Sequence, residues 1–173
     1  MAGENEDGSR IDALERRLRD VEDQLAIYRL LAAYGPAVDS RTEAATAGLW
    51  TETGRYDYGG APLVGAQAIG DLVNIQPHVG YVERGCAHVI GMPFVAVEGD
   101  RATATGYSRV YLHDGDGWKV ERTSANRWEL ERTQSGWKVA NRVNRLLDGS
   151  PDGRELLSRA FVQSNGEETD VVS

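Results

Sequence analysis

The sequence predicts an α+β fold in which helices cover one face of a curved antiparallel sheet. Helical periodicity dominates the first half of the chain, and β-branched and aromatic runs separated by turn residues follow His88. A chain of 173 residues with 40% hydrophobic residues can bury one core, so we expect a single domain. Helices followed by such a sheet can enclose a cavity between the two layers, which predicts a cone-shaped architecture.

The composition limits the classes of function. Nineteen Lys and Arg against 27 Asp and Glu give a net charge of −8, which disfavours nucleic acid as a partner. No apolar run approaches the roughly 20 residues of a membrane helix, and no signal peptide is recognisable. We therefore expect a cytoplasmic protein without a membrane partner. Phosphate-binding glycine loops and zinc-spaced Cys and His are missing, so neither cofactor nor metal is expected, and Cys86 is interpreted as a small buried hydrophobe.

The first long element is a helix. Residues 1–9 and 164–173 are too polar to offset their ordering entropy and are predicted to be disordered tails. The folded domain is expected over 10–147. Apolar residues then recur at alternating steps of three and four, at Ile11, Leu14, Leu18, Val21, Leu25, Tyr28 and Ala32. This stripe predicts one long helix whose apolar face packs on the sheet or on another subunit.

A bend and short elements follow. Gly35 and Pro36 interrupt the helix, which places Tyr34 and Asp39 at a bend. Helical residues resume to about residue 50. Residues 54–60 then alternate like a short strand that places Tyr56 and Tyr58 on one face, and a short helix is expected over 64–73.

The second half predicts an antiparallel meander. Strands are expected over 88–97, 101–111, 118–130 and 137–147, separated by the turn sequences at 98–100, 114–117 and 134–136. Arg142 shares a strand face with Ala140 and Asn144, and an inward arginine needs an anion, a carbonyl or an acidic neighbour. A break at 148–153 precedes a short helix, so 148–163 is interpreted as a C-terminal extension.

Three separated residues carry the candidate chemistry. A carboxylate such as Asp39 can fix one imidazole nitrogen of His88 while the other nitrogen takes a proton, and the phenol of Tyr34 can supply one. Structural interpretations stand beside this one. His88 could be a hydrogen-bonded core histidine, Asp39 a turn residue and Tyr34 the last core residue of the helix. His78, next to Pro77, is expected in a loop.

The chain resembles the SnoaL-like branch of the nuclear transport factor 2-like superfamily over about residues 10–147. The fold markers are Val97-Glu98-Gly99-Asp100-Arg101-Ala102 and Gly136-Trp137-Lys138-Val139. The spacing of Tyr34, Asp39, Tyr58 and His88 is similar to the catalytic set of bile-acid 7α-dehydratase. The Asp-His pair also resembles that of scytalone dehydratase and hexachlorocyclohexane dehydrochlorinase.

The resemblance implies a cofactor-independent lyase of the dehydratase type that acts on a hydrophobic cyclic hydroxy-carbonyl compound, such as a steroid or polyketide. Asp39 and His88 would act as the base and Tyr34 as the acid. Tyr58, Tyr56, Asn126 and Arg142 would bind the substrate. The alternatives are a polyketide cyclase or isomerase with the same dyad, or a non-catalytic ligand-binding module. A homo-oligomer, either trimer or dimer, is expected.

Overall fold

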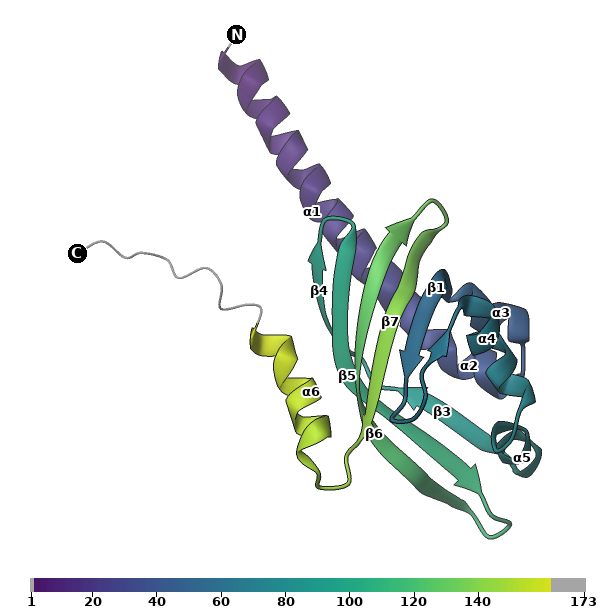
Figure 1. Ribbon diagram of the computed structural model, residues 1–173. Helices are drawn as coiled ribbons and strands as arrows, with labels where there is room; N and C mark the ends of the chain where they lie inside the picture. The colour runs from purple at the N-terminus through teal and green to yellow at the C-terminus, as the bar shows by residue number, and fades with distance from the viewer. Residues whose placement is uncertain (1, 163–173) are drawn as a thin grey trace.

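The computed structural model describes the backbone of residues 2–162 and the side chains of residues 7–161. A long helix, α1, projects from a body formed by a curved sheet and short helices (Figure 1). This arrangement confirms the predicted α+β fold. The predicted tail at 164–173 lies outside the described residues.

Helix α1 spans Ala2–Ala32, so it includes most of the segment that we expected to be a disordered tail. The N-terminal part of α1 extends beyond the sheet (Figure 1). Once the C-terminal part of a helix is held by packing, each further residue adds one backbone hydrogen bond without a new nucleation cost. Composition alone does not capture this propagation, which explains why the prediction differs from the structure over residues 2–9.

Seven strands form one sheet. They are β1 (Trp50–Asp57), β2 (Leu63–Val64), β3 (Cys86–Ile90), β4 (Phe94–Glu98), β5 (Arg101–His113), β6 (Trp118–Thr133) and β7 (Gly136–Leu146). The order along the sheet is β2-β1-β7-β6-β5-β3, and β4 also pairs with β5. All pairs are antiparallel except that between β1 and β7. The three hairpins predicted after residue 93 are therefore present.

The strand predicted over 88–97 is two strands. Gly91, Met92 and Pro93 separate β3 from β4, because proline cannot donate to the ladder. β4 pairs with the beginning of β5, where Phe94 lies opposite Thr105, and β3 pairs with its end, where His88 lies opposite Val110. Because of this interruption, β5 pairs with two short strands, β4 and β3. His88 lies in β3, which forms an edge of the sheet. β1 also begins earlier than expected, at Trp50.

The short helices are α2 (Tyr34–Asp39), α3 (Glu43–Gly48), α4 (Ala66–Asp71), the 3₁₀ turn η1 (Leu72–Asn74) and α5 (His78–Arg84). They pack along the sheet from β1 and β2, which α4 contacts, to β3, which α2 and α5 contact. Figure 1 shows them gathered on one side of the strands, whereas α6 (Pro151–Val162) lies on the other side. The helix predicted over 64–73 begins at Ala66, because Leu63 and Val64 pair with β1. The helix α5 was not predicted.

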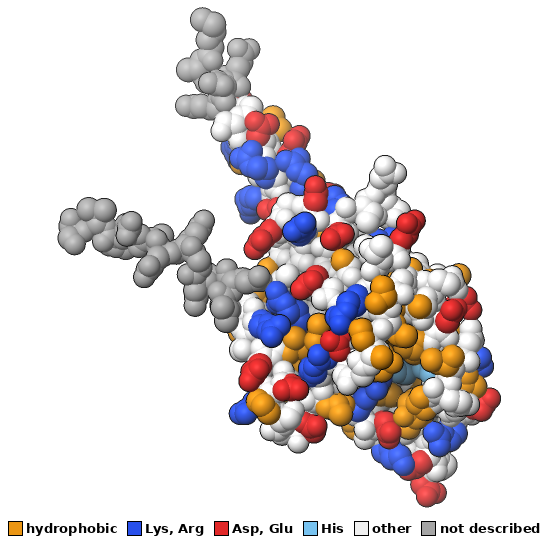
Figure 2. Space-filling model, viewed as in Figure 1, with side chains coloured by type: hydrophobic (Ala, Val, Ile, Leu, Met, Phe, Trp, Pro, Cys, Tyr) orange, Lys and Arg blue, Asp and Glu red, His pale blue; other side chains and the backbone are white. Residues whose placement is uncertain are grey.

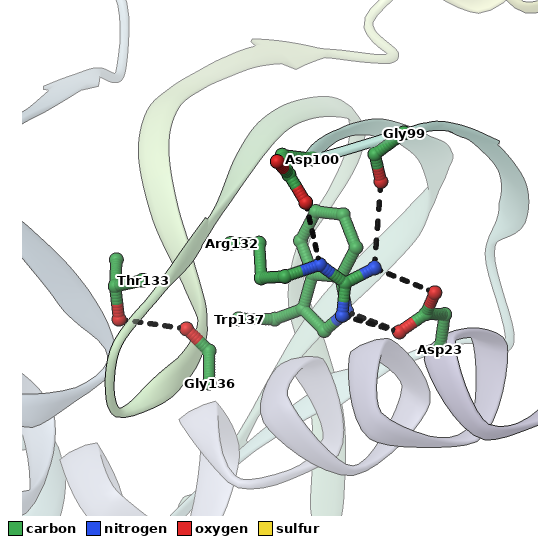
Figure 3. Close-up of polar contacts among 7 residues, drawn as sticks. All are labelled: Asp23, Gly99, Asp100, Arg132, Thr133, Gly136 and Trp137. Atoms are coloured by element: carbon green, nitrogen blue, oxygen red, sulfur yellow. Dashed lines mark hydrogen bonds and ion pairs between the residues drawn. The ribbon is translucent and has the colours of Figure 1, made fainter. Parts of the chain in front are cut away.

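The core lies between α1 and the concave side of the sheet. It consists of Ile27, Leu31, Trp50, Tyr56, Ile69, Ala102, Ala104, Trp128, Leu130, Trp137 and Val139. Helix α1 thus contributes Ile27 and Leu31, which are not members of the predicted stripe. Arg132, in the hairpin between β6 and β7, binds the same face of α1 (Figure 3). Arg132 donates two hydrogen bonds to the Asp23 carboxylate, at 2.7 and 2.6 Å, and stacks over the Trp137 ring.

Candidate active site

A close approach of backbones joins α2 to β3. A Cβ atom built on Gly35 would lie 2.1 Å from the carbonyl oxygen of His88, so no residue with a side chain fits there without a shift. Asp39 lies four residues after Gly35 and therefore on the same face of the helix. The glycine in the sequence thus explains how the Asp39 carboxylate comes within reach of His88. Pro36 occupies the first turn of α2, where its missing N–H costs little.

Asp39 holds His88 at two points. Its Oδ1 atom lies 2.6 Å from Nδ1 of the His88 ring, and its Oδ2 atom accepts a hydrogen bond of 2.7 Å from the His88 backbone nitrogen. Burial of the carboxyl would raise its pKa, but the hydrogen bonds from His88 outweigh that effect and keep the pKa of Asp39 below its ordinary value. Asp39 is therefore a carboxylate at neutral pH, and it accepts a proton-bearing Nδ1. The lone pair of His88 then lies on Nε2.

The sulfur of Cys86 completes this cluster. Its thiol donates to Oδ1 of Asp39 at 3.3 Å, and burial together with the Asp39 charge raises the pKa of Cys86 to about 12. A thiol that stays protonated is a poor nucleophile and a poor metal ligand. Asp39, Cys86 and His88 offer ligand atoms within 4.8 Å of one another. An ion there would displace the thiol proton and the bond between Asp39 and His88, so the arrangement fits a hydrogen-bonded pair better than a metal site.

A cavity of about 160 Å³ adjoins His88. Figure 2 shows a histidine surface among hydrophobic side chains on this part of the molecule. The walls come from α2, β1, the segment from η1 to α5, β3 and β6. The lining residues are Tyr34, Val38, Tyr56, Tyr58, Leu72, Ile75, Gln76, Pro77, His78, Tyr81, His88 and Arg122. The site is thus apolar and aromatic, with a small number of polar groups, as is typical of small-molecule sites.

Tyr34 stands beside His88 in this wall. The two rings meet edge to face with their centroids 6.5 Å apart. Burial, reinforced by the neighbouring Tyr56, raises the pKa of Tyr34 to about 12, although the nearby Arg142 opposes this shift. The phenol is therefore protonated at neutral pH and can donate a proton or a hydrogen bond into the cavity.

Arg142 is a buried cation next to the cavity. Its guanidinium carbon lies 4.3 Å from the ring centre of Tyr34, 4.7 Å from that of Tyr56 and 5.4 Å from that of Trp128. The side chain is 2% exposed, and its Nη1 atom has no hydrogen-bond partner among the described residues. No carboxylate within residues 7–161 forms an ion pair with it. A buried donor without a partner is costly, and a bound oxygen atom would satisfy it.

Asn126 positions this arginine. Its side-chain oxygen accepts hydrogen bonds from Nε and Nη2 of Arg142, at 3.0 and 2.9 Å, and from Asn144, at 2.9 Å. Its amide nitrogen donates to Ser108 at 2.8 Å. Arg142 lines a smaller cavity of about 10 Å³, which Tyr34 and His88 also line. Asn126 is fully buried and lines neither this cavity nor the larger one. The structure therefore places Asn126 on the same face of the sheet as Arg142 but outside the cavity lining, and its expected contact with substrate stays a prediction.

The remaining predicted residues lie where a ligand could meet them. Tyr56 is buried in the cavity wall, and Tyr58 is 45% exposed at its rim, with their ring centres 5.4 Å apart. Tyr56 lies in β1 and Tyr58 directly follows the strand, and the contact between their rings places both on one side, as predicted. Tyr34, Asp39 and His88 come together although up to 54 residues separate them in the chain.

Several residues of the cavity wall were not predicted from the sequence. His78 is buried in α5, where its Nε2 lies 2.8 Å from the carbonyl oxygen of Val38, and its ring centre is 5.4 Å from that of His88. Burial lowers the pKa of His78. The expected loop was therefore wrong, and Pro77 was the available signal, since proline often opens a helix. Arg122 and Tyr81 also line the cavity, and no motif marks them.

Comparisons with known proteins agree with this architecture. The model of the SnoaL-like domain matches residues 19–143. An NTF2-like protein with a cystatin-like fold from Novosphingobium aromaticivorans is 43% identical, with a TM-score of 0.81 over 83% of this chain and 94% of that one. A second protein from this organism, whose name proposes an aromatic ring hydroxylase, is 27% identical, with a TM-score of 0.61 over 77% of this chain and 96% of that one.

A more distant similarity shows the fold alone. A protein of unknown function from Mycobacterium tuberculosis is 21% identical, with a TM-score of 0.68 over 85% of this chain and 91% of that one. No curated protein matches the sequence. Among the described residues, no helix is long and apolar enough to cross a membrane. The family match and the shared fold together show that the chain belongs to the SnoaL-like family of the NTF2-like superfamily, which includes polyketide cyclases and dehydratases.

Proposed function

We propose that this protein is a cofactor-independent lyase of the dehydratase type, which removes water from a cyclic hydroxy-carbonyl compound. The observation that carries the proposal is the hydrogen bond of 2.6 Å between Asp39 and His88 at the wall of an apolar cavity. A histidine whose Nδ1 is held by a carboxylate presents a basic Nε2, and this arrangement is a recurrent general base.

The base would act on a carbon-bound proton. Nε2 of His88 takes a proton from the carbon next to the substrate carbonyl, and the electron pair of that C–H bond forms an enolate. The imidazolium that results bears one positive charge, and the Asp39 carboxylate stabilises it through Nδ1. Because Asp39 fixes the orientation of the His88 ring, Nε2 is held in line with the C–H bond that it attacks, which speeds the proton transfer.

The acid would act on the leaving group. As the enolate collapses to a carbon–carbon double bond, the C–O bond breaks and the hydroxyl leaves with the proton of Tyr34 as water. A phenol with a pKa of about 12 is still far more acidic than water, so the transfer to a departing hydroxide is favourable. The phenolate then recovers a proton from the His88 imidazolium through solvent, which returns both groups to their starting states.

Arg142 would bind the oxygen that gains charge. Its Nη1 atom lacks a partner among the described residues, and the guanidinium lies against Tyr34 at the inner end of the site. A substrate carbonyl directed towards this nitrogen would gain a charged hydrogen bond that strengthens as the enolate forms. Because no carboxylate within residues 7–161 pairs with Arg142, its charge remains available for this role.

The cavity limits the substrate. A volume of about 160 Å³ resembles that of a cavity which holds a single benzene ring, roughly 150 Å³. The reacting ring would fill it, and any further rings would extend past the exposed Tyr58 towards solvent. Burial of apolar ligand surface against these aromatic side chains is favourable, which supports a hydrophobic cyclic substrate such as a steroid or polyketide.

A mass-resolved turnover screen tests the proposal. Cyclic β-hydroxy ketones of one to four rings are incubated with the wild type and with His88→Ala. The matched control is His113→Ala, at the end of β5 and outside the cavity lining. We expect a product that is lighter by one water with the wild type and the control only. A product of unchanged mass would show an isomerase or cyclase, and saturable binding without turnover in all three proteins would show a binding module.

A further inference from the structure

The first five residues of the predicted apolar stripe of α1 face away from the domain. Ile11, Leu14, Leu18, Val21 and Leu25 are between 47% and 63% exposed, although each is a large apolar side chain. The contacts of α1 with its own domain instead come from Asp23, Ile27 and Leu31. With about 100° per residue, these three lie on roughly the opposite side of the helix from the stripe. One helix therefore carries two faces, of which only one is covered.

The uncovered face has the spacing of a coiled coil. Steps of three and four repeat without interruption from Ile11 to Tyr28, which assigns the stripe to the a and d positions of a heptad. An isolated helix without packing is marginally stable in water, yet α1 continues to Ala2 beyond its last contact with the sheet. The family model begins at residue 19, so most of this projecting segment lies outside it.

The flanking charges indicate which partner fits. In the heptad frame, Arg10 and Arg17 occupy g positions, whereas Glu15 and Glu22 occupy e positions. All four are exposed. In a parallel pair of identical helices, each g residue faces the e residue of the next heptad on the partner. Both of the resulting contacts, Arg10 with Glu15 and Arg17 with Glu22, join opposite charges.

An antiparallel pair would reverse this outcome. There, g positions face g positions and e positions face e positions, so arginines would oppose arginines and glutamates would oppose glutamates. Glu15 also forms an exposed pair with Arg19 of its own helix at 3.7 Å, a contact of small energetic weight that leaves the carboxylate accessible. The charges of these four residues are thus complementary in the parallel orientation and not in the antiparallel one, and the third parallel contact, between Gln24 and Arg29, opposes no like charges.

We infer that α1 is a self-association helix, which pairs in parallel with α1 of a second copy of this chain through Ile11, Leu14, Leu18, Val21 and Leu25. The seam continues into an apolar groove between α1 and the link from β3 to β4, lined by Tyr28, Leu31, Ala32, Ile90, Gly91, Met92 and Pro93. Met92 is 81% exposed there. The inference is independent of the proposed activity, because no residue of the stripe lines the active-site cavity.

Sedimentation velocity of the full chain tests the interface. The wild type is expected to sediment as a dimer, and Leu18→Glu with Val21→Glu is expected to sediment as a monomer at the same concentration. Ala13→Glu with Ala26→Glu adds the same charges away from the stripe and should remain dimeric. A monomeric wild type, or a dimer that survives the Leu18 and Val21 substitutions, would overturn the inference.

Charge exchange tests the pairing. A chain with Arg10→Glu and Arg17→Glu, and a second chain with Glu15→Arg and Glu22→Arg, each place like charges across the seam and should dimerise poorly. Mixed together, they should form a heterodimer, since positions 10 and 15 and positions 17 and 22 then face each other with opposite charges. Failure of the mixture to associate better than either chain alone would contradict the assigned heptad frame.

Cysteine cross-linking tests the orientation. Leu14→Cys faces its own copy in a parallel pair, whereas Arg16→Cys lies on the opposite side of the helix. Mild oxidation should cross-link the first variant and leave the second as single chains on a non-reducing gel. Equal cross-linking of both variants, or of neither, would exclude the parallel arrangement. The native Cys86 is shared by both proteins and lies in β3.

Discussion

Asp39 accepts hydrogen bonds from both the ring nitrogen and the backbone nitrogen of His88. The ring contact fixes the tautomer, and the backbone contact fixes where α2 sits on β3. One carboxylate therefore couples the chemistry of the site to its architecture. Substitutions that separate these two contributions give the sharpest predictions.

Asp39→Asn should abolish most activity while it preserves the fold. The amide can still accept the bond from the His88 backbone, but its NH₂ group directed at Nδ1 would draw the lone pair there and leave the proton on Nε2. We expect kcat to fall about 10²–10⁴-fold, the usual contribution of a general base. Nitrogen NMR of labelled histidine would show the change of tautomer, and an unchanged tautomer with unchanged kcat would contradict the role of Asp39.

Gly35→Ala should destabilise the protein and displace the dyad. The new methyl group would lie 2.1 Å from the His88 carbonyl oxygen, and because both neighbours are backbone, the helix itself must move. Overpacking of this kind costs about 1–3 kcal/mol of unfolding free energy. Gly48→Ala is the matched control, since nothing lies within 4 Å of its Cβ position. Urea unfolding gives the unfolding free energy of both variants. Equal values would contradict the close contact between Gly35 and the His88 backbone.

Asn126→Asp should weaken catalysis by giving Arg142 a counterion. The carboxylate can keep the hydrogen bonds from Arg142 and Asn144, and the Ser108 hydroxyl can donate in place of the lost amide. The guanidinium charge would then be neutralised before substrate arrives. A charged hydrogen bond contributes about 1.5–3 kcal/mol, so kcat/KM should fall about 10–100-fold. Unchanged kcat/KM with an intact circular dichroism spectrum would show that Arg142 does not bind the reacting oxygen.

The pair between Asp23 and Arg132 should make stability depend on acid pH. The hydrogen bonds from Arg132 lower the pKa of Asp23 from its ordinary value of 3.8. A carboxyl group with a lowered folded pKa adds stability above its unfolded pKa, and that stability is lost as the pH falls through the folded value.

Asp23→Asn should therefore reduce Tm at neutral pH, and the difference from the wild type should shrink as the pH falls below 3.8. Asp20→Asn removes the same charge from an exposed position of the same helix and should leave Tm nearly unchanged. A gap in Tm that stays constant across this pH range would show that Asp23 stabilises α1 without its charge.

The sequence predicted the parts of the fold that depend on local pattern. Alternation of side chains placed Tyr56 and Tyr58 together, and turn residues marked the three hairpins, because both signals are written in neighbouring residues. The pairing of Asp39 with His88 could be expected only through the resemblance to known enzymes. Geometry alone would not have found it, since the contact depends on how closely α2 approaches β3 at Gly35.

Two residues lie elsewhere than expected, for related physical reasons. Asn126 faces inward as expected, but Arg142 is the longer side chain and reaches past it towards the cavity. Pro77 could have indicated the start of a helix at His78, but nothing in the neighbouring residues revealed that α5 packs His78 against Val38. The apolar stripe of α1 illustrates the opposite case, because the pattern was correct and only its partner was left open.

Exchange of hydrogen for deuterium at carbon tests the base without requiring a leaving group. A cyclic ketone that lacks the hydroxyl is incubated in D₂O with the wild type, His88→Ala, and the control His113→Ala, and the label next to the carbonyl is followed by mass spectrometry. We predict exchange with the wild type and the control, and a rate reduced about 10²–10⁴-fold for His88→Ala. Exchange by His88→Ala at the wild-type rate would contradict the assignment of His88 as the base.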